Sequence, residues 1–212
     1  RDIDSLMERT MHRPLVRGVM SPRAALTFAV VIEVVAFVWL FATVNLLSAV
    51  LAVSATFFYV FVYTLWLKRT TTQNIVIGGG AGAFPPVIGW AAVTGNVPLD
   101  AWILFAITFF WTPPHYWPLS LRFKDDYAAA GVPMLPVVAP LSLVAREIIG
   151  YSWAMVVTSF VLIPAAGMSA FYAVAAALLL AERPTPELGI AALGLFTGMA
   201  LVVKRPAPRP AA

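Results

Sequence analysis

Apolar runs of the length of a membrane-spanning helix dominate this sequence. A helix needs about 20 mainly apolar residues to cross the hydrocarbon core of a bilayer. Five runs meet this length and two shorter ones follow them: 24–42, 46–67, 74–93, 99–121 and 142–163, then 169–181 and 188–203. Helices satisfy their own backbone hydrogen bonds within the bilayer. The sequence therefore predicts an all-α fold, a polytopic membrane helical bundle of about seven spans.

The composition agrees with a membrane protein and excludes several functions. Hydrophobic residues make up 61% of the 212 residues and charged residues only 11%, whereas soluble domains carry about 25% charged residues. The chain has no cysteine, which excludes disulfides and thiolate metal sites. The basic residues lie at helix ends and form no stripe, so we expect no nucleic-acid partner.

Lysine and arginine residues occur only in alternate loops of the predicted bundle. They precede the first span, follow the second, lie between the fourth and fifth, and follow the sixth: Arg1, Arg9, Arg13, Arg17 and Arg23, then Lys68 and Arg69, then Arg122, Lys124 and Arg146, then Arg183. Positive loops face the cytoplasm. We therefore expect these loops, and the two acidic clusters that they contain, on the cytoplasmic side. Lys204 and Arg205 break the rule, since seven spans would place them outside.

The first acidic cluster contains Asp2, Asp4 and Glu8. Asp4 and Glu8 are four residues apart and would share a helix face, whereas Asp2 would point to the opposite side. Asp4 is thus the better metal-ligand candidate and Asp2 the second. On this cluster alone, a solvated charged helix end is the alternative.

A second acidic cluster, Asp125 and Asp126, favours a metal site over a solvated helix end. Magnesium is usually held by a few carboxylates together with substrate phosphates, and diphosphate prefers cationic partners. The cations near the two clusters are Arg9, Arg13, Lys68 and Lys124. Metal and cations together make diphosphate a good leaving group. The sequence thus predicts a magnesium-diphosphate site.

A proline-rich aromatic run, Trp-Thr-Pro-Pro-His-Tyr-Trp-Pro, occupies positions 111–118 of the fourth span. Its His115 is the only histidine within a predicted span. An ionisable group at membrane depth is a functional candidate, but a helix-packing hydrogen bond explains it equally well. The prolines remove backbone donors, so we expect a kinked or unwound helix here.

A glycine-rich run opens the third span at positions 73–82. Gly78 and Gly82 have the spacing that permits close helix approach, and no Lys-Ser/Thr pair follows to make a phosphate loop. Asn74 lies at the cytoplasmic end near Lys68, where it would face the polar site. Glu33 in the first span should face the bundle interior.

These segments together resemble a known family. In order, they are positions 1–4, 7–10 and 13–15, then 63–69, 73–79, 84–86, 111–115, 126–127 and 131–136. The chain resembles the protoheme IX farnesyltransferases (haem O synthases), a branch of the UbiA-type membrane prenyltransferase superfamily, and the Trp-Thr-Pro-Pro-His run indicates the haem branch. Beyond residue 141 only a generic membrane pattern remains.

The resemblance implies a site and a topology. Asp4 matches the last acid of an Asn-x-x-x-Asp-x-x-x-Asp motif whose earlier members would precede residue 1. Asp126 with Tyr127 matches the second motif, with Asp125 assisting. The family has nine membrane helices, so we expect residues 1–212 to be one prenyltransferase domain that lacks the first two helices and is inactive alone.

The resemblance also implies the activity. A farnesyl group would pass from farnesyl diphosphate to a vinyl group of haem B, giving haem O, with Mg²⁺ as cofactor. The expected roles are as follows: catalytic, Asp4, Asp126 and Lys68; substrate-binding, Arg9, Arg13, Asn74, Lys124, Tyr127 and His115; metal-binding, Asp4, Asp126, Asp2 and Asp125. The implied location is a bacterial plasma membrane rather than a mitochondrial inner membrane, with haem A synthase or oxidase-assembly proteins as partners besides the lipid bilayer.

Two alternatives stay open. One is a UbiA-type prenyltransferase with another aromatic acceptor, a quinone precursor or a chlorophyllide. The other is a membrane transporter, since broken spans with glycine and proline occur around transporter sites. The absence of a visible inverted repeat and the clustering of charge at one surface argue against the transporter.

Overall fold

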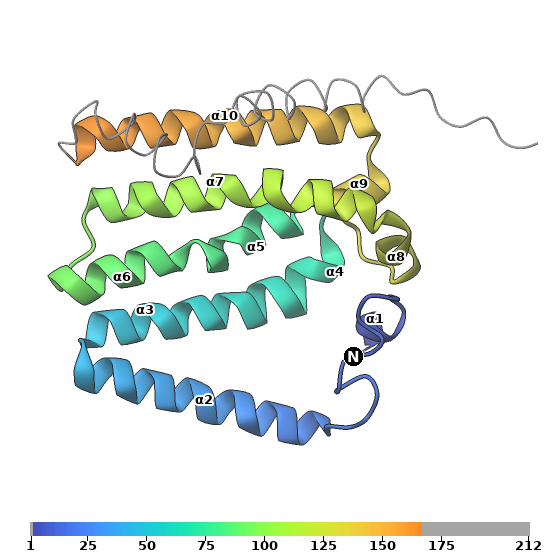
Figure 1. Cartoon of the computed structure of the whole chain (residues 1–212), viewed down its shortest axis with the longest axis horizontal. Helices are drawn as coiled ribbons and strands as arrows, with labels where there is room; N and C mark the ends of the chain where they lie inside the picture. The colour runs from blue at the N-terminus through green and yellow to red at the C-terminus, as the bar shows by residue number, and fades with distance from the viewer. Residues whose placement is uncertain (1, 167–212) are drawn as a thin grey trace, which may run out of the picture.

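The computed structural model describes residues 2–166, and the regular structure in this range is helical throughout (Figure 1). Four helical stretches are long and apolar enough to cross a membrane: Pro22–Thr43, Leu46–Thr70, Asn74–Thr94 and Leu141–Ala165. The predicted all-α multi-pass membrane fold is thus confirmed. The two shorter runs, 169–181 and 188–203, lie outside the described residues, as do Lys204 and Arg205.

The fifth predicted span is the helix α7 (Leu99–Arg122). It has the length of a span but a lower hydropathy than the other four. Of the two forms expected at its prolines, kinked or unwound, the unwound one is wrong, because the helix continues through Pro113, Pro114 and Pro118. Helices α5 and α10 pack along α7, and such packing stabilises a helix that lacks some backbone donors.

The second stretch consists of three consecutive helical segments. They are α3 (Leu46–Phe57), the π-helix η1 (Phe58–Leu67) and α4 (Lys68–Thr70). Asn45 caps α3, since its side chain accepts a hydrogen bond from the Ser48 amide and donates one to the Ala91 carbonyl, both at 2.8 Å. In η1 the Thr64 hydroxyl donates to the Tyr59 carbonyl, five residues earlier. The wider turn of a π-helix often marks a functional site.

The third stretch is broken near its middle into α5 (Asn74–Gly82) and α6 (Phe84–Thr94). Two prolines in the first turn of α6 explain the break, because a proline lacks the amide that would continue α5 but suits a helix start. Gly95 ends α6 with a positive φ of 71°, which glycine adopts without strain.

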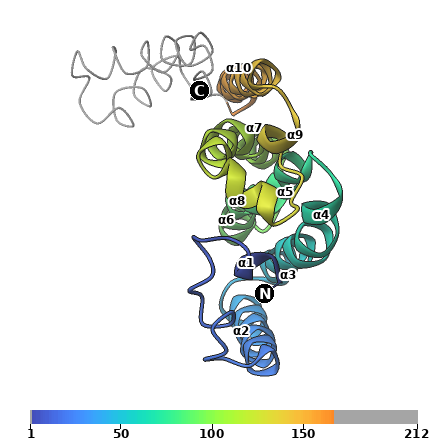
Figure 2. The same ribbon diagram turned by 90° about the vertical axis from the view of Figure 1, so that its right-hand side faces the viewer.

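The long helices lie side by side, and the short ones gather at one end (Figures 1 and 2). Helices α2 (Pro22–Thr43), α3, α5 with α6, α7 and α10 (Leu141–Ala165) form the row. The short helices at the end of the row are α1 (Asp2–Ser5), α4, α8 (Lys124–Ala129) and α9 (Leu135–Val138). This end carries both acidic clusters.

Candidate functional site

The segment after α1 is fixed to the loop region around α8 and α9 by a buried methionine. Met7 is only 3% exposed and packs in a hydrophobic cluster whose other buried members are Ile75, Tyr127, Val132 and Met134. The structure thereby brings the segment with the first acidic cluster against the segment with the second. Because α1 ends at Ser5, the predicted shared helix face of Asp4 and Glu8 is wrong.

Asp4 forms an ion pair with Arg13. The Arg13 Nη1 lies 3.2 Å from each Asp4 carboxylate oxygen, and the Asp4 side chain is 21% exposed against 58% for Arg13. The Thr10 hydroxyl, itself buried, donates to the Asp4 backbone carbonyl at 2.9 Å. Asp4 is therefore positioned by its own segment, with one carboxylate face still accessible.

Asp2 forms a bidentate pair with Arg69 of α4. The two nitrogen–oxygen distances are 2.9 and 3.0 Å, and both side chains are mainly exposed. The Arg69 guanidinium holds the pKa of Asp2 well below its usual range. This pair ties α1 to the end of the second membrane stretch, which indicates a clamping role for Asp2.

Lys68 lies half-buried among these charges. The charged groups that act on it are the Asp4 carboxylate and the guanidinium groups of Arg13, Arg69 and Arg9. We call this set, Asp4, Arg9, Arg13, Lys68 and Arg69, the polar mouth. Its excess of positive charge suits an anion that carries several negative charges.

Arg9 connects the polar mouth to α8. Its guanidinium lies 5.0 Å from the centre of the Phe123 ring, within cation–π range. Arg9 also interacts with the Tyr127 hydroxyl. Burial raises the pKa of Tyr127. The nearby Tyr116 and Asp126 raise this pKa further, whereas the Arg9 guanidinium lowers it. The hydroxyl thus stays protonated at neutral pH and can donate a hydrogen bond.

The acids of the second cluster lie in the first turn of α8. Asp126 is half-buried and close enough to act on Tyr127, whereas Asp125 and Lys124 are exposed. Within residues 2–166, no three carboxylate or histidine groups converge as a complete metal site. The arrangement can therefore supply one or two carboxylates to a metal, with the remaining ligands coming from substrate phosphates and water.

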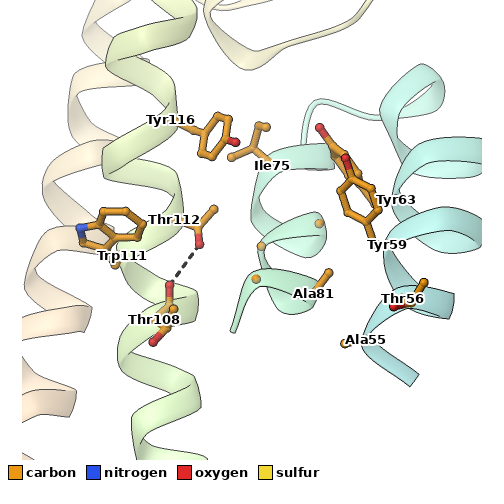
Figure 3. A pocket seen from close by; sticks show the side chains of 13 residues that line it. Ala55, Thr56, Tyr59, Tyr63, Ile75, Ala81, Thr108, Trp111, Thr112 and Tyr116 are labelled. Carbon is orange, nitrogen blue, oxygen red and sulfur yellow. Dashed lines mark hydrogen bonds between the residues drawn. The ribbon is translucent and has the colours of Figure 1, made fainter. Parts of the chain in front are cut away.

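A cavity of about 470 Å³ opens between η1, α5 and α7 (Figure 3). Its aromatic walls come from Tyr59, Tyr63, Trp111 and Tyr116. The remaining lining residues are small or aliphatic: Ala55, Thr56, Ile75, Gly78, Gly79, Ala81, Gly82, Thr108 and Thr112. Lys68 directly follows η1, so the polar mouth lies along the chain from one end of the cavity. An apolar cavity near a group of cations suits an amphiphilic ligand with an anionic head.

Glycines on α5 let the neighbouring helices approach. A Cβ atom at Gly78 would collide with the Tyr63 ring, and one at Gly79 would lie 2.9 Å from the Thr112 side chain. The predicted packing role is confirmed for Gly78. For Gly82 it is wrong, because a Cβ there meets nothing within 4 Å.

Asn74 and His115 lie apart from the cavity lining. Asn74 is fully buried, its Nδ2 donates to the Thr71 carbonyl at 2.8 Å, and its Oδ1 has no hydrogen-bond partner. His115 is exposed and stacks on Trp111 with ring centres 4.2 Å apart. Its stacking partner is a cavity residue, so His115 lies beside the cavity. Glu33 is half-buried on α2, a helix with no fully buried residue.

Sequence reasoning missed the aromatic cavity residues. Tyr59 and Tyr63 are four residues apart on one helix face, with ring centres 5.5 Å apart. Figure 3 shows the Tyr116 hydroxyl pointing from α7 toward Ile75 on α5. The four-residue spacing of Tyr59 and Tyr63 could have indicated a shared aromatic face. Aromatic residues that face lipid have the same spacing, so it does not identify a cavity.

The fold and the site define the chain as a helical membrane bundle with an apolar cavity and a group of cations at one end. The family model described as "UbiA prenyltransferase family" matches residues 1–183, and the chain belongs to that family.

Several curated relatives carry the name protoheme IX farnesyltransferase. The protein from Frankia alni is 58% identical over 176 residues, which cover 83% of this chain and 61% of the relative. The protein from Clavibacter sepedonicus is 55% identical over 176 residues, covering 83% and 58%. The protein from Streptomyces avermitilis is 55% identical over 178 residues, covering 84% and 58%. The chain thus spans about three fifths of the length of these relatives. No solved structure matches it significantly.

Proposed function

We propose that the protein to which this chain belongs transfers a farnesyl group from farnesyl diphosphate to a vinyl group of haem B, giving haem O. The observation that carries this proposal is an apolar cavity whose walls lead to the polar mouth. Lys68 directly follows the cavity helix η1, and Ile75 both lines the cavity and packs in the cluster of Met7. The names of relatives at 55–58% identity support farnesyl as the group and protohaem as the acceptor. The family itself supports prenyl transfer from a diphosphate.

In this proposal the polar mouth binds the diphosphate. Arg13, Arg9 and Lys68 neutralise the negative charge that grows on the leaving oxygen as its bond to C1 of the farnesyl group breaks. The bonding electrons leave with the diphosphate, and C1 becomes electron-deficient. Tyr127, held protonated by burial, would donate a hydrogen bond to a diphosphate oxygen.

The cavity would hold the farnesyl chain. Its apolar walls exclude water, which would otherwise capture the allylic cation. The faces of Tyr63 and Tyr116 stabilise positive charge near the opening. The π electrons of the vinyl group then form the new bond to C1, and the vinyl carbon left electron-deficient takes up water and releases a proton.

We further propose Mg²⁺ as the metal, with Asp4 and Asp126 as ligands and Asp2 and Asp125 assisting. The carboxylates of Asp4 and Asp126, both only partly exposed, fit a metal shared with the diphosphate. When bound, the ion would neutralise part of the diphosphate charge. Because Asp2 is paired with Arg69, its main proposed role is to hold α1 in place rather than to bind the metal directly.

The acceptor would lie beside the Trp111–His115 stack, at the edge of the cavity. An exposed aromatic pair offers a flat surface to a porphyrin, and His115 offers a nitrogen to its iron. The alternation of basic loops supports placing this end in the cytoplasm. The membrane would be a bacterial plasma membrane. Haem A synthase or oxidase-assembly proteins would be its partners.

The test uses the full-length protein in detergent or nanodiscs with farnesyl diphosphate, haem B and Mg²⁺. We expect release of diphosphate and a prenylated haem, identified by mass spectrometry. Product formation from a quinone precursor or a chlorophyllide but not from haem B would assign the other acceptor. Full activity of an Asp126→Ala variant would overturn the metal assignment, and unchanged haem binding by a His115→Ala variant would remove the ligand role.

A further inference from the structure

The cavity has a charged end and a far end. The charged end is marked by Tyr63, Ile75 and Tyr116, since Lys68 follows Tyr63 on the same helical stretch and α8 follows α7. From Ile75 the helix α5 rises about 10 Å to Gly82, and from Tyr116 the helix α7 runs about 12 Å back to Thr108, at 1.5 Å per residue. The two walls therefore give similar depths for the cavity, about 10 and 12 Å.

The far end is lined only by small or short side chains, which are Ala55, Thr56, Ala81, Gly82 and Thr108. Gly82 differs from the other cavity glycines in what surrounds it. A Cβ at Gly78 or Gly79 would run into Tyr63 or Thr112, whereas one at Gly82 meets nothing within 4 Å. A side chain at position 82 would thus enter the cavity without displacing the fold.

We propose that Gly82 sets the length of the prenyl chain that the cavity accepts, because its missing side chain leaves room for a third isoprene unit. This inference rests on the proposed function, because it assumes that a prenyl chain occupies the cavity. An extended chain advances about 3.5 Å for every three bonds. By that measure an isoprene unit of four main-chain bonds spans about 4.7 Å, two units about 9 Å and three units about 14 Å.

The depth of the cavity then places the third isoprene unit beside Gly82. The first two isoprene units of the chain end before the level of Gly82 and Thr108. The third unit would occupy the space that is open because Gly82 has no side chain. Gly82 contacts the tail of a farnesyl chain and leaves a geranyl chain untouched. A leucine at this position would fill the site of the third unit alone.

The experiment measures chain-length preference in the full-length protein. Wild type, Gly82→Leu and the control Gly89→Leu are assayed with haem B and geranyl, farnesyl or geranylgeranyl diphosphate. Gly89 lies on α6 outside the cavity, and a Cβ there also meets nothing within 4 Å. We expect Gly82→Leu to lower the ratio of kcat/KM for farnesyl over geranyl diphosphate at least tenfold, and Gly89→Leu to leave it unchanged.

The outcomes separate the two proposals. If wild type uses no prenyl diphosphate, the proposed function fails. If wild type uses farnesyl diphosphate and Gly82→Leu keeps the same preference, the length limit fails alone. Should Gly82→Leu not fold, as judged by thermal unfolding, Gly82→Val and Ala55→Leu test the same end of the cavity. An unchanged farnesyl-to-geranyl ratio in these folded variants overturns the inference.

Discussion

Arg13 Nη1 lies 3.2 Å from both carboxylate oxygens of Asp4. Arg13 is expected to bind the diphosphate and Asp4 the metal, so two groups with different expected ligands are paired with each other. The two groups neutralise each other in this arrangement. Binding of a metal-diphosphate would separate them, since the metal takes the carboxylate and the phosphate oxygens take the guanidinium. If the proposed site is right, the pair keeps both side chains in place until such a ligand binds.

Replacement of Arg13 should affect substrate binding much more than stability. An ion pair this exposed contributes about 0.2–1 kcal/mol to folding, whereas a lost diphosphate contact weakens binding of a charged ligand by about 1.5–3 kcal/mol. We expect Arg13→Gln to raise the KM for farnesyl diphosphate about tenfold or more, with the melting temperature nearly unchanged. Arg17→Gln, on the same loop, is the control. An equal KM in both variants would contradict the role of Arg13.

Met7 should be the anchor of the N-terminal segment. Truncation of a buried methionine costs about 2–5 kcal/mol, and the loss here falls on one local contact between the N-terminal segment and α8–α9. We expect Met7→Ala to speed hydrogen exchange in residues 2–20 and 124–138 while the membrane helices keep their protection. Met11→Ala is the matched control, because Met11 is 44% exposed. Equal exchange in the two variants would show that Met7 does not anchor the segment.

The Asp2–Arg69 pair predicts a specific pH dependence. The pKa of Asp2 is lower in the folded protein than its ordinary value of about 3.9, so the folded state favours the ionised carboxylate. The stabilisation is complete above that ordinary value and is lost as the pH falls toward the folded-state pKa. We expect the difference in melting temperature between wild type and Asp2→Asn to be constant from pH 5 to 8, to shrink below about pH 4 and to fall with added salt. Asp100→Asn, at the start of α7, is the comparison, and a difference that grows on acidification would refute the pairing.

The sequence predicted the membrane helices well because hydropathy is a local property. Each of the five longer apolar runs is helical within a few residues of its expected bounds. The break at Ala83, the π-helix η1 and the single-turn α1 were not predicted. These features depend on backbone hydrogen-bond register and on packing against neighbours, which a hydropathy pattern does not contain.

The charges of the site were predictable, but their partners were not. Alternate basic loops placed Asp4, Arg13 and Lys68 at one end of the bundle. The bond between Arg69 and Asp2, however, joins residues 67 positions apart. The Nδ2 of Asn74, a predicted substrate-binding residue, donates to the Thr71 carbonyl, while its buried Oδ1 has no partner. A sequence does not show such a local bond, because a polar residue at the start of a helix can satisfy a backbone carbonyl as readily as a ligand.

The contact between Gly78 and Tyr63 gives the last prediction. Since a Cβ at Gly78 would collide with the Tyr63 ring, Gly78→Ala must displace either the ring or α5. Overpacking of this kind costs about 1–3 kcal/mol, although alanine favours a helix over glycine by about 1 kcal/mol. We expect a lower melting temperature and a reduced kcat from the displaced cavity wall. Gly89→Ala, which meets nothing within 4 Å, should instead raise the melting temperature slightly and keep full activity. If Gly78→Ala lowers the melting temperature of wild type but not that of a Tyr63→Ala variant, the ring is the clashing group, because its atoms are then absent. A stable, fully active Gly78→Ala single variant would show that the close approach is not required.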